Sequence, residues 1–172
     1  MYRYPELFGV YMLIWFLIAA IAVILDQVTK WLAVEFLTKV ETVPLIQNVL
    51  HLTYLENTGA AFGILKNNRW VFLIISTVAI IALLAYIAKF PPKSKWLGVG
   101  LSFIVGGGIG NMIDRVLLGY VVDFIDFRLI NFAVFNVADS FVCVGAVLVL
   151  IYVFFFSDKK KEVENAADTD GK

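Results

Sequence analysis

The sequence predicts an α-helical membrane protein with four transmembrane helices, cytoplasmic N and C termini, and a small β-sheet and short helix on the outer face. Hydrophobic residues make up 61% of the 172 positions, well above the roughly 45–50% of soluble domains. Four apolar segments, at about residues 7–25, 70–88, 96–118 and 138–156, approach or exceed the ~20 residues that cross a bilayer. Charged residues, only 16% of the chain, gather in a few places.

The distribution of lysines predicts which side each connection faces. The connection between the second and third segments carries Lys89, Lys93 and Lys95, and such short lysine-rich loops stay in the cytoplasm. Residues 1–157 then form one membrane domain, followed by a polar cytoplasmic tail, 158–172, whose composition predicts disorder. The connections at 26–69 and 119–137 must face outward.

These two outer connections contain their own predicted structure. Residues 49–55 are rich in β-forming side chains, and residues 121–127 and 132–137 also look extended. Because backbone near the membrane must satisfy its hydrogen bonds, we expect these pieces to pair into a sheet. Residues 26–41 look helical, with Asp26 and Lys30 spaced to form an i, i+4 ion pair.

Polar side chains gather at the outer ends of the four segments. Spans three and four are antiparallel, and each carries an Asn-x-x-Asp spacing at this end, which on a helix means one face. Asp114 is expected to pair with the adjacent Arg115 at a helix end. The set comprises Asp26, Asn57, Asn111, Asp114, Arg115, Asp123, Asn136 and Asp139.

The residue inventory excludes several chemistries. One histidine and one cysteine, Cys143, cannot supply the nitrogen and sulfur ligands of a zinc hydrolase, and no HExxH, GxSxG or Walker-type motif is present. The formal net charge is zero and no basic stripe indicates nucleic-acid binding. The glycine run at 106–110 lies inside an apolar span, where it favours close helix packing over phosphate binding.

Asp123 and Asp139 remain as the candidate catalytic pair. No basic residue lies within four positions of either one, and two carboxylates that share a proton can activate water without a metal or cofactor. Asp139 lies near the start of span four, where the helix dipole favours the ionised form. Asp123 has apolar neighbours that favour the protonated form.

Other interpretations of these carboxylates stay open at this level. Asp126 reads as a solvated loop carboxylate near Arg128, with no assigned role. Intramembrane carboxylates also occur in small proton- or ion-coupled carriers, although a relay would place charges at several depths. A non-catalytic scaffold is the third possibility.

The polar segments, in order, resemble the bacterial lipoprotein signal peptidase (signal peptidase II) family over about residues 10–155. The second motif is Asn-Thr-Gly-Ala-Ala-Phe-Gly at 57–63, and Gly59 permits a turn there. The others are Asp-Gln-Val-Thr-Lys at 26–30, Gly-Gly-Ile-Gly-Asn-Met-Ile-Asp-Arg at 107–115, Val-Val-Asp-Phe at 121–124 and Phe-Asn-Val-Ala-Asp-Ser at 135–140.

The resemblance implies a membrane aspartyl peptidase of the bacterial inner membrane, with its site at the periplasmic face. Its substrate would be a diacylglyceryl-modified prolipoprotein, cut on the amino side of the lipobox cysteine. By family motif, Asp123 and Asp139 would form the catalytic dyad. The outer sheet would be a β-cradle, and part of the outer region would close over substrate. Separately from the resemblance, nothing in the sequence requires more than a monomer surrounded by membrane lipid. The remaining motif residues would support the site or bind substrate, namely Asp26, Lys30, Asn57, Gly59, Asn111, Asp114, Arg115 and Asn136.

Overall fold

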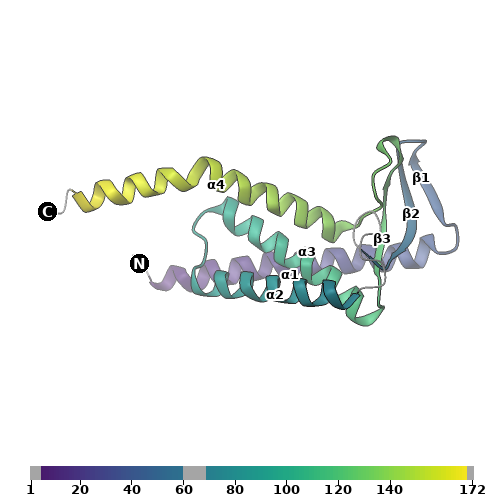
Figure 1. Cartoon of the computed structure of the whole chain (residues 1–172), viewed down its shortest axis with the longest axis horizontal. Coiled ribbons are helices and arrows are strands. Elements are labelled where there is room, and N and C mark those ends of the chain that lie inside the picture. Colours follow the sequence, from purple (N-terminus) through teal and green to yellow (C-terminus); the bar gives the residue numbers. More distant parts are fainter. Residues whose placement is uncertain (1–4, 60–68, 170–172) are drawn as a thin grey trace.

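The computed structural model describes residues 5–59 and 69–169 and shows long helices capped at one end by a small sheet (Figure 1). Both termini lie at the end of the helices away from the sheet. The elements are, in order, α1 (Pro5–Leu37), β1 (Thr42–Ile46), β2 (Leu50–Asn57), α2 (Arg69–Lys89), α3 (Lys95–Leu117), β3 (Val121–Phe127), the 3₁₀ turn η2 (Arg128–Ile130) and α4 (Val137–Thr169).

The four long helices confirm the predicted membrane architecture. Each of them is long and apolar enough to cross a bilayer. The predicted helix at residues 26–41 is confirmed as far as Leu37, where it continues α1 without a break instead of forming a short helix of its own. No proline or glycine lies between positions 10 and 37, so nothing in the sequence stops the helix at the membrane boundary. Asp26 and Lys30 therefore lie within a continuous helix.

The end of α4 also differs from the expectation. The predicted disordered tail at 158–172 is helical as far as Thr169. A polar composition predicts disorder because it cannot bury a core, but a helix already started in the membrane needs no new nucleus to continue. No proline or glycine interrupts residues 146–170.

The sheet is antiparallel, in the order β1-β2-β3. β2 and β3 confirm the two predicted strands, whereas β1 was not predicted because Pro44 interrupts it. β1 lies at the edge of the sheet, where a missing N–H is tolerated. The extended piece at 132–137 was wrong as a strand. It makes only an isolated bridge between Phe135 and Ile125, because Asn136 already caps the start of α4.

α3 lies between α1 and α4, and glycines allow both helices to approach it closely. A Cβ on Gly106 would lie 2.7 Å from the carbonyl oxygen of Ala19 in α1. One on Gly107 would collide with the carbonyl oxygen of Ala138 in α4. The predicted packing role of the glycine run is confirmed.

We expect Gly107→Ala to lower the free energy of unfolding by about 1–3 kcal/mol, the usual range for overpacking a filled interface. Gly9→Ala is the matched control, because a Cβ there has nothing within 4 Å and alanine favours the helix. Thermal unfolding in detergent micelles, followed by tryptophan fluorescence, measures both. Equal midpoints for the two variants would contradict the packing argument.

Candidate active site

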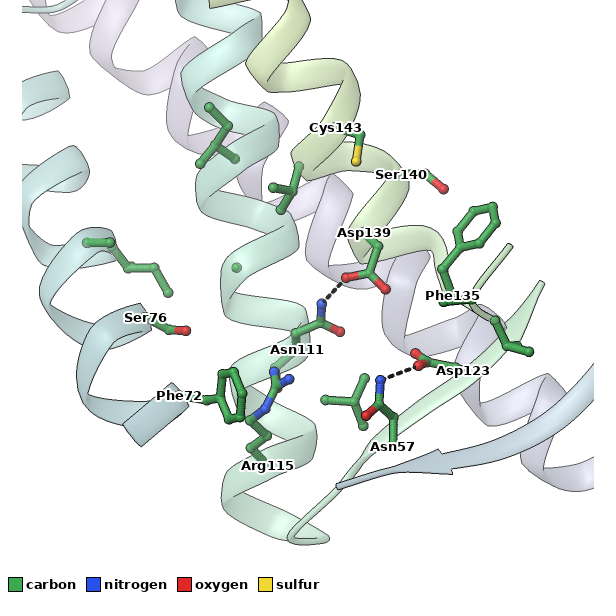
Figure 2. Close-up of a pocket in the computed structure, with 18 of the residues that line it drawn as sticks. Asn57, Phe72, Ser76, Asn111, Arg115, Asp123, Phe135, Asp139, Ser140 and Cys143 are labelled. Carbon is green, nitrogen blue, oxygen red and sulfur yellow. Dashed lines mark hydrogen bonds between the residues drawn. The ribbon is translucent and has the colours of Figure 1, made fainter. Parts of the chain in front are cut away.

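The two candidate aspartates line one cavity of about 650 Å³ among α2, α3, α4 and the sheet (Figure 2). Asp123 comes from β3 and Asp139 from the first turn of α4. Asn57, Asn111 and Arg115 line the same cavity. Segments distant in sequence therefore place five of the predicted site residues around one space.

Asp139 is held by the structure that starts α4. The backbone N–H of Asp139 donates to Asn136 Oδ1 at 2.9 Å. In return, the backbone N–H of Asn136 donates to Asp139 Oδ2 at 3.2 Å. This is a reciprocal capping box. The Asn-x-x-Asp spacing at 136–139 was expected to place two side chains on one helix face, but it instead marks the helix start.

Asp123 is almost fully buried and accepts from two side-chain amides. Asn57 Nδ2 donates to its Oδ2 at 2.8 Å, and Asn136 Nδ2 donates to its Oδ1 at 2.6 Å. Burial raises the pKa of Asp123 to about 6, and the charge of Asp139 acts in the same direction. The two amide hydrogen bonds oppose this rise but do not cancel it. Asp123 can therefore carry a proton near neutral pH.

Asn111 connects the dyad candidates to a buried charge cluster. Its Nδ2 donates to Asp139 Oδ1 at 2.7 Å. Its Oδ1 accepts from Lys30 Nζ at 2.8 Å and from Asn136 Nδ2 at 3.0 Å. All four carboxylate oxygens of Asp123 and Asp139 thus accept from neutral amide N–H groups.

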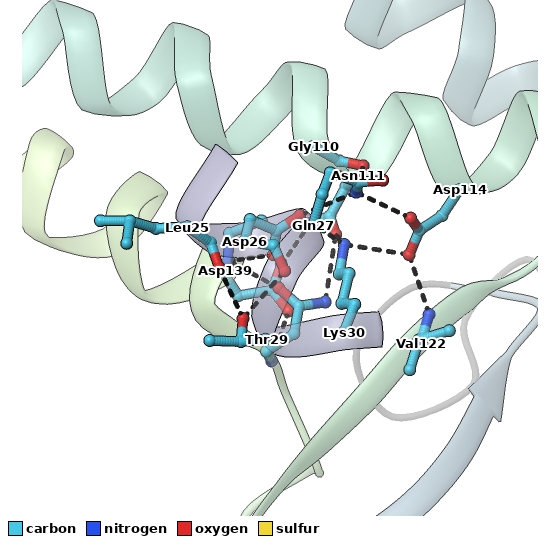
Figure 3. A network of polar contacts seen from close by, with 12 residues as sticks. Leu25, Asp26, Gln27, Thr29, Lys30, Gly110, Asn111, Asp114, Val122 and Asp139 are labelled. Carbon is cyan, nitrogen blue, oxygen red and sulfur yellow. Dashed lines mark hydrogen bonds and ion pairs between the residues drawn. The ribbon is translucent and has the colours of Figure 1, made fainter. Parts of the chain in front are cut away.

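The buried cluster consists of Asp26, Lys30 and Asp114 (Figure 3). Lys30 Nζ lies 2.9 Å from Asp26 Oδ2 and 3.0 Å from Asp114 Oδ2. The predicted pair between Asp26 and Lys30 is confirmed. The predicted pairing of Asp114 with Arg115 was wrong, because neighbours on a helix point about 100° apart. Asp114 faces α1, whereas Arg115 faces the cavity.

The two carboxylates of this cluster also hold the backbone beside each candidate aspartate. Asp26 Oδ1 accepts from the N–H of Ala138 at 2.9 Å. Asp114 Oδ2 accepts from the N–H of Val122 at 3.1 Å. Ala138 precedes Asp139 in α4, and Val122 precedes Asp123 in β3. The cluster therefore holds the backbone of α4 and of β3 directly beside the two candidate aspartates. Gly110 is required for this approach, because a Cβ there would collide with the Asp26 carboxylate.

Arg115 places a guanidinium at the cavity wall. Its Nη1 donates to the carbonyl of Asn111 and its Nη2 to the carbonyl of Gly59, each at 3.3 Å. The guanidinium carbon lies 5.0 Å from the centre of the Phe72 ring in α2. The N–H of Gly59 donates to Asn57 Oδ1 at 3.0 Å, which turns the Asn57 amide toward Asp123. Residues 60–63 of the predicted motif lie outside the described residues.

Asp126 lies away from the cavity, in a network that ties the strands together. Arg128 Nε donates to Asp126 Oδ2 at 2.9 Å, and Thr53 Oγ1 donates to the same oxygen at 2.8 Å. Burial alone would raise the pKa of Asp126, but these hydrogen bonds, together with the charges of Arg128 and His51, outweigh it and hold the pKa below the ordinary value. The predicted proximity to Arg128 is confirmed. The predicted solvated loop was wrong, because Asp126 belongs to β3 and is only 9% exposed.

Comparison with known proteins places this geometry in a family. A sequence model of signal peptidase (SPase) II matches residues 18–155. The lipoprotein signal peptidase of Clostridioides difficile (strain 630) is 46% identical over 150 residues, covering 87% of this chain and 100% of that one. That of Caldanaerobacter subterraneus subsp. tengcongensis is 50% identical over 139 residues, covering 81% and 94%. The chain belongs to the signal peptidase II family.

A solved structure shares the fold of this signal peptidase II family member. It is described as a bacterial membrane enzyme determined by the in meso method at 2.3 Å resolution. Its TM-score is 0.74 at 37% identity, covering 85% of this chain and 90% of that chain. The chain is therefore a peptidase and a multi-pass bacterial membrane protein, which confirms the resemblance carried by the five motifs.

Two features of this signal peptidase II site escaped sequence reasoning. Gln27 Nε2 bridges Asp26 Oδ2 at 3.2 Å and Asp114 Oδ1 at 3.0 Å. Gln27 could have been predicted as a site residue, since it lies inside the motif at 26–30. The cavity wall from α2, including Phe72 and Ser76, could not be predicted because that span is apolar apart from Ser76 and Thr77 and carries no charge that marks one face. Within the described ranges, no cluster of three His, Cys, Asp or Glu side chains is placed to hold a metal.

Proposed function

We propose that this protein is an aspartic endopeptidase that removes signal peptides from prolipoproteins, cutting on the amino side of a diacylglyceryl-modified cysteine. Asp123 and Asp139 are the catalytic pair. The observation that supports the proposal most is that both aspartates line one cavity. Each accepts hydrogen bonds from amide donors, and Asp114 and Asp26 hold the backbone beside Asp123 and Asp139, respectively. The names of its relatives supply the substrate class.

The proposed reaction uses the two carboxyl groups as base and acid. Asp139, at the N-terminus of α4, takes a proton from water as the oxygen attacks the scissile carbonyl carbon. Protonated Asp123 gives its proton to the carbonyl oxygen, which yields a tetrahedral diol. The C–N bond then breaks, a diol proton returns to Asp123, and the departing nitrogen receives the proton held by Asp139. Atoms and charge balance without a metal or cofactor.

The cavity suits a substrate that combines a peptide with acyl chains. Its polar wall is formed by Asp123, Asp139 and Arg115, and its apolar wall by side chains such as Leu83 of α2 and Val142 of α4. Arg115 is placed to bind a substrate carbonyl, since guanidinium has only donors. The apolar wall extends along membrane spans, so acyl chains remain in hydrocarbon while the peptide bond reaches the pair.

The direct test compares two peptides with the purified protein. One is a lipobox peptide whose cysteine carries diacylglycerol, and the other is its unlipidated counterpart. We expect mass spectrometry to find a new amino-terminal lipidated cysteine from the first peptide and no cleavage of the second. Equal cleavage of both would overturn the lipid requirement, and cleavage of neither would overturn the function.

We expect kcat/KM to fall as pH rises through about 6, because this parameter reports the free enzyme. Burial raises the pKa of Asp123 to about 6, so the proposed acid is protonated below that pH and loses its proton above it. Asn57→Ala removes a hydrogen bond that favours the ionised form. The falling limb should therefore move to higher pH in that variant. A limb that stays in place or moves lower would contradict the assignment.

The side of the membrane follows from the lysine distribution. If the loop with Lys89, Lys93 and Lys95 is cytoplasmic, the sheet and cavity lie at the outer, periplasmic end of the helices, where lipoprotein precursors are processed. We further propose a monomer surrounded by lipid. The carrier alternative loses its support, because the chain belongs to a peptidase family.

A further inference from the structure

We propose that Lys30 is a positioning residue, which keeps the side-chain amide of Asn111 turned with its NH₂ group toward Asp139. The inference rests on the proposed function, because Asp139 is assigned there to the catalytic pair. Lys30 does not line the cavity in the described part of the chain. It lies behind the pair, almost fully buried, with its Nζ reaching the oxygen of the Asn111 amide.

The argument begins with which groups an amide can face. A lysine ammonium has three donors and no acceptor, whereas an amide has an acceptor oxygen with two lone pairs and a nitrogen with two donors. Lys30 Nζ lies 2.8 Å from Asn111 Oδ1. If the amide were rotated by 180°, two donors would face each other. The positive charge of Lys30 therefore selects one amide orientation.

The selected orientation directs the amide nitrogen at the pair. Asn111 Nδ2 then lies 2.7 Å from Asp139 Oδ1 and donates to it. The second lone pair of Asn111 Oδ1 accepts from Asn136 Nδ2 at 3.0 Å. Both acceptor positions of the Asn111 oxygen are thus occupied by donors.

The occupation of both acceptor positions of Asn111 Oδ1 matters when Asp139 holds a proton. A protonated carboxyl is a donor, and an unrestrained neighbouring amide would rotate to accept that proton in a hydrogen bond. Because Lys30 occupies the oxygen, the amide cannot do so without facing an ammonium. The proton on Asp139 consequently stays available to the departing nitrogen. Lys30 contributes by charge through Asn111 rather than by contact with substrate.

The kinetic test is a double-mutant cycle of Lys30→Met with Asn111→Ala. We expect Lys30→Met to lower kcat by roughly 10- to 100-fold, the size of a lost hydrogen bond to a charged group, with KM nearly unchanged. Lys30→Arg, also a donor without acceptors, should restore most of this loss. In the Asn111→Ala protein, adding Lys30→Met should lower kcat no further. Losses that multiply would overturn the proposal and show a separate structural role.

Lys30→Met leaves two buried carboxylates without their cation, so folding must be controlled. The same cycle is therefore repeated in an Asp114→Asn background, where Lys30→Met keeps the formal charge of the cluster at that of the native protein. An asparagine oxygen can still accept from the N–H of Val122. In this background too, adding Lys30→Met to Asn111→Ala should lower kcat no further. If the two losses in kcat multiply here, the proposal is equally overturned.

A second readout does not need catalytic activity. In detergent micelles with ¹⁵N-labelled asparagine, the Asn111 side-chain NH₂ is identified by its absence in Asn111→Ala. We expect the hydrogens of this NH₂ group to exchange with solvent at least about tenfold faster in Lys30→Met than in the native protein. This factor corresponds to the loss of ~1.4 kcal/mol of hydrogen-bond energy that holds the amide in place. In Lys30→Arg the exchange rate should equal that of the native protein. Unchanged exchange in Lys30→Met would overturn the proposal. Failure of peptide cleavage would refute the function alone, because this spectrum still decides the role of Lys30.

Discussion

Asp123→Asn and Asp139→Asn should each reduce cleavage of the lipidated peptide by roughly 10⁴-fold, the upper range for loss of a general acid or base. Asparagine keeps the size of the side chain, and its oxygen can still accept one of the two hydrogen bonds that each carboxylate accepts, so the protein should remain inserted and folded. The loss should appear in kcat. The measurement is single-turnover cleavage by purified protein, with thermal unfolding in detergent as the folding check.

Asp126→Asn is the matched control for this pair. It makes the same substitution on β3, the strand that carries Asp123, at a carboxylate that does not line the cavity. Asp126 contacts Thr53 and Arg128 instead, so cleavage should stay within a few-fold of the native rate. If Asp126→Asn were as inactive as Asp123→Asn, the loss would reflect damage to the sheet. Substantial turnover by either candidate variant would refute the dyad.

Asn136→Ala should lower both stability and turnover, because one side chain serves the helix and the pair. It caps α4 through Asp139 and donates to Asp123 and Asn111. Loss of a cap and exposure of unpaired buried partners should cost about 2–4 kcal/mol of unfolding free energy. Loss of a preorganised donor should cost roughly 10²- to 10³-fold in kcat. Unfolding midpoints and single-turnover rates measure the two effects.

Asn136→Ser separates these two roles. Serine is a good N-cap and can accept from the N–H of Asp139, but its hydroxyl is too short to replace an amide that spans Asp123 and Asn111. We expect the serine variant to recover most of the stability lost in Asn136→Ala and little of the turnover. Recovery of both together would mean that capping alone explains the residue.

The membrane helices were predictable because hydrocarbon imposes a length and a composition on any segment that crosses it. Their ends were less predictable. Nothing in the sequence distinguishes the membrane boundary near Asp26 from the continuing helix, since both fit helical periodicity. β1 was missed for a related reason, because Pro44 reads as a strand breaker unless its place at the sheet edge is known.

The site shows a similar division. Asp123 and Asp139 could be singled out because no nearby basic residue explains either carboxylate. The partner of Asp114 could not be predicted, since the choice between Arg115 and Lys30 depends on how α1 packs against α3. The cavity wall from α2 was invisible for the same reason, because tertiary packing decides which face of a uniformly apolar helix is empty.

The hydrogen bond from Ala138 to Asp26 spans 112 positions of the chain, and this has a consequence for biosynthesis. The first helix holds the backbone beside a residue supplied only by the last one. The ribosome makes the first helix early and the last helix late. A chain that ends before α4 therefore contains Asp123 without Asp139, and its Asp26 has no Ala138 N–H to accept from. Under the proposed mechanism, proteolytic activity therefore arises only once the final helix has joined the bundle, and unfinished copies should be harmless to other proteins in the membrane.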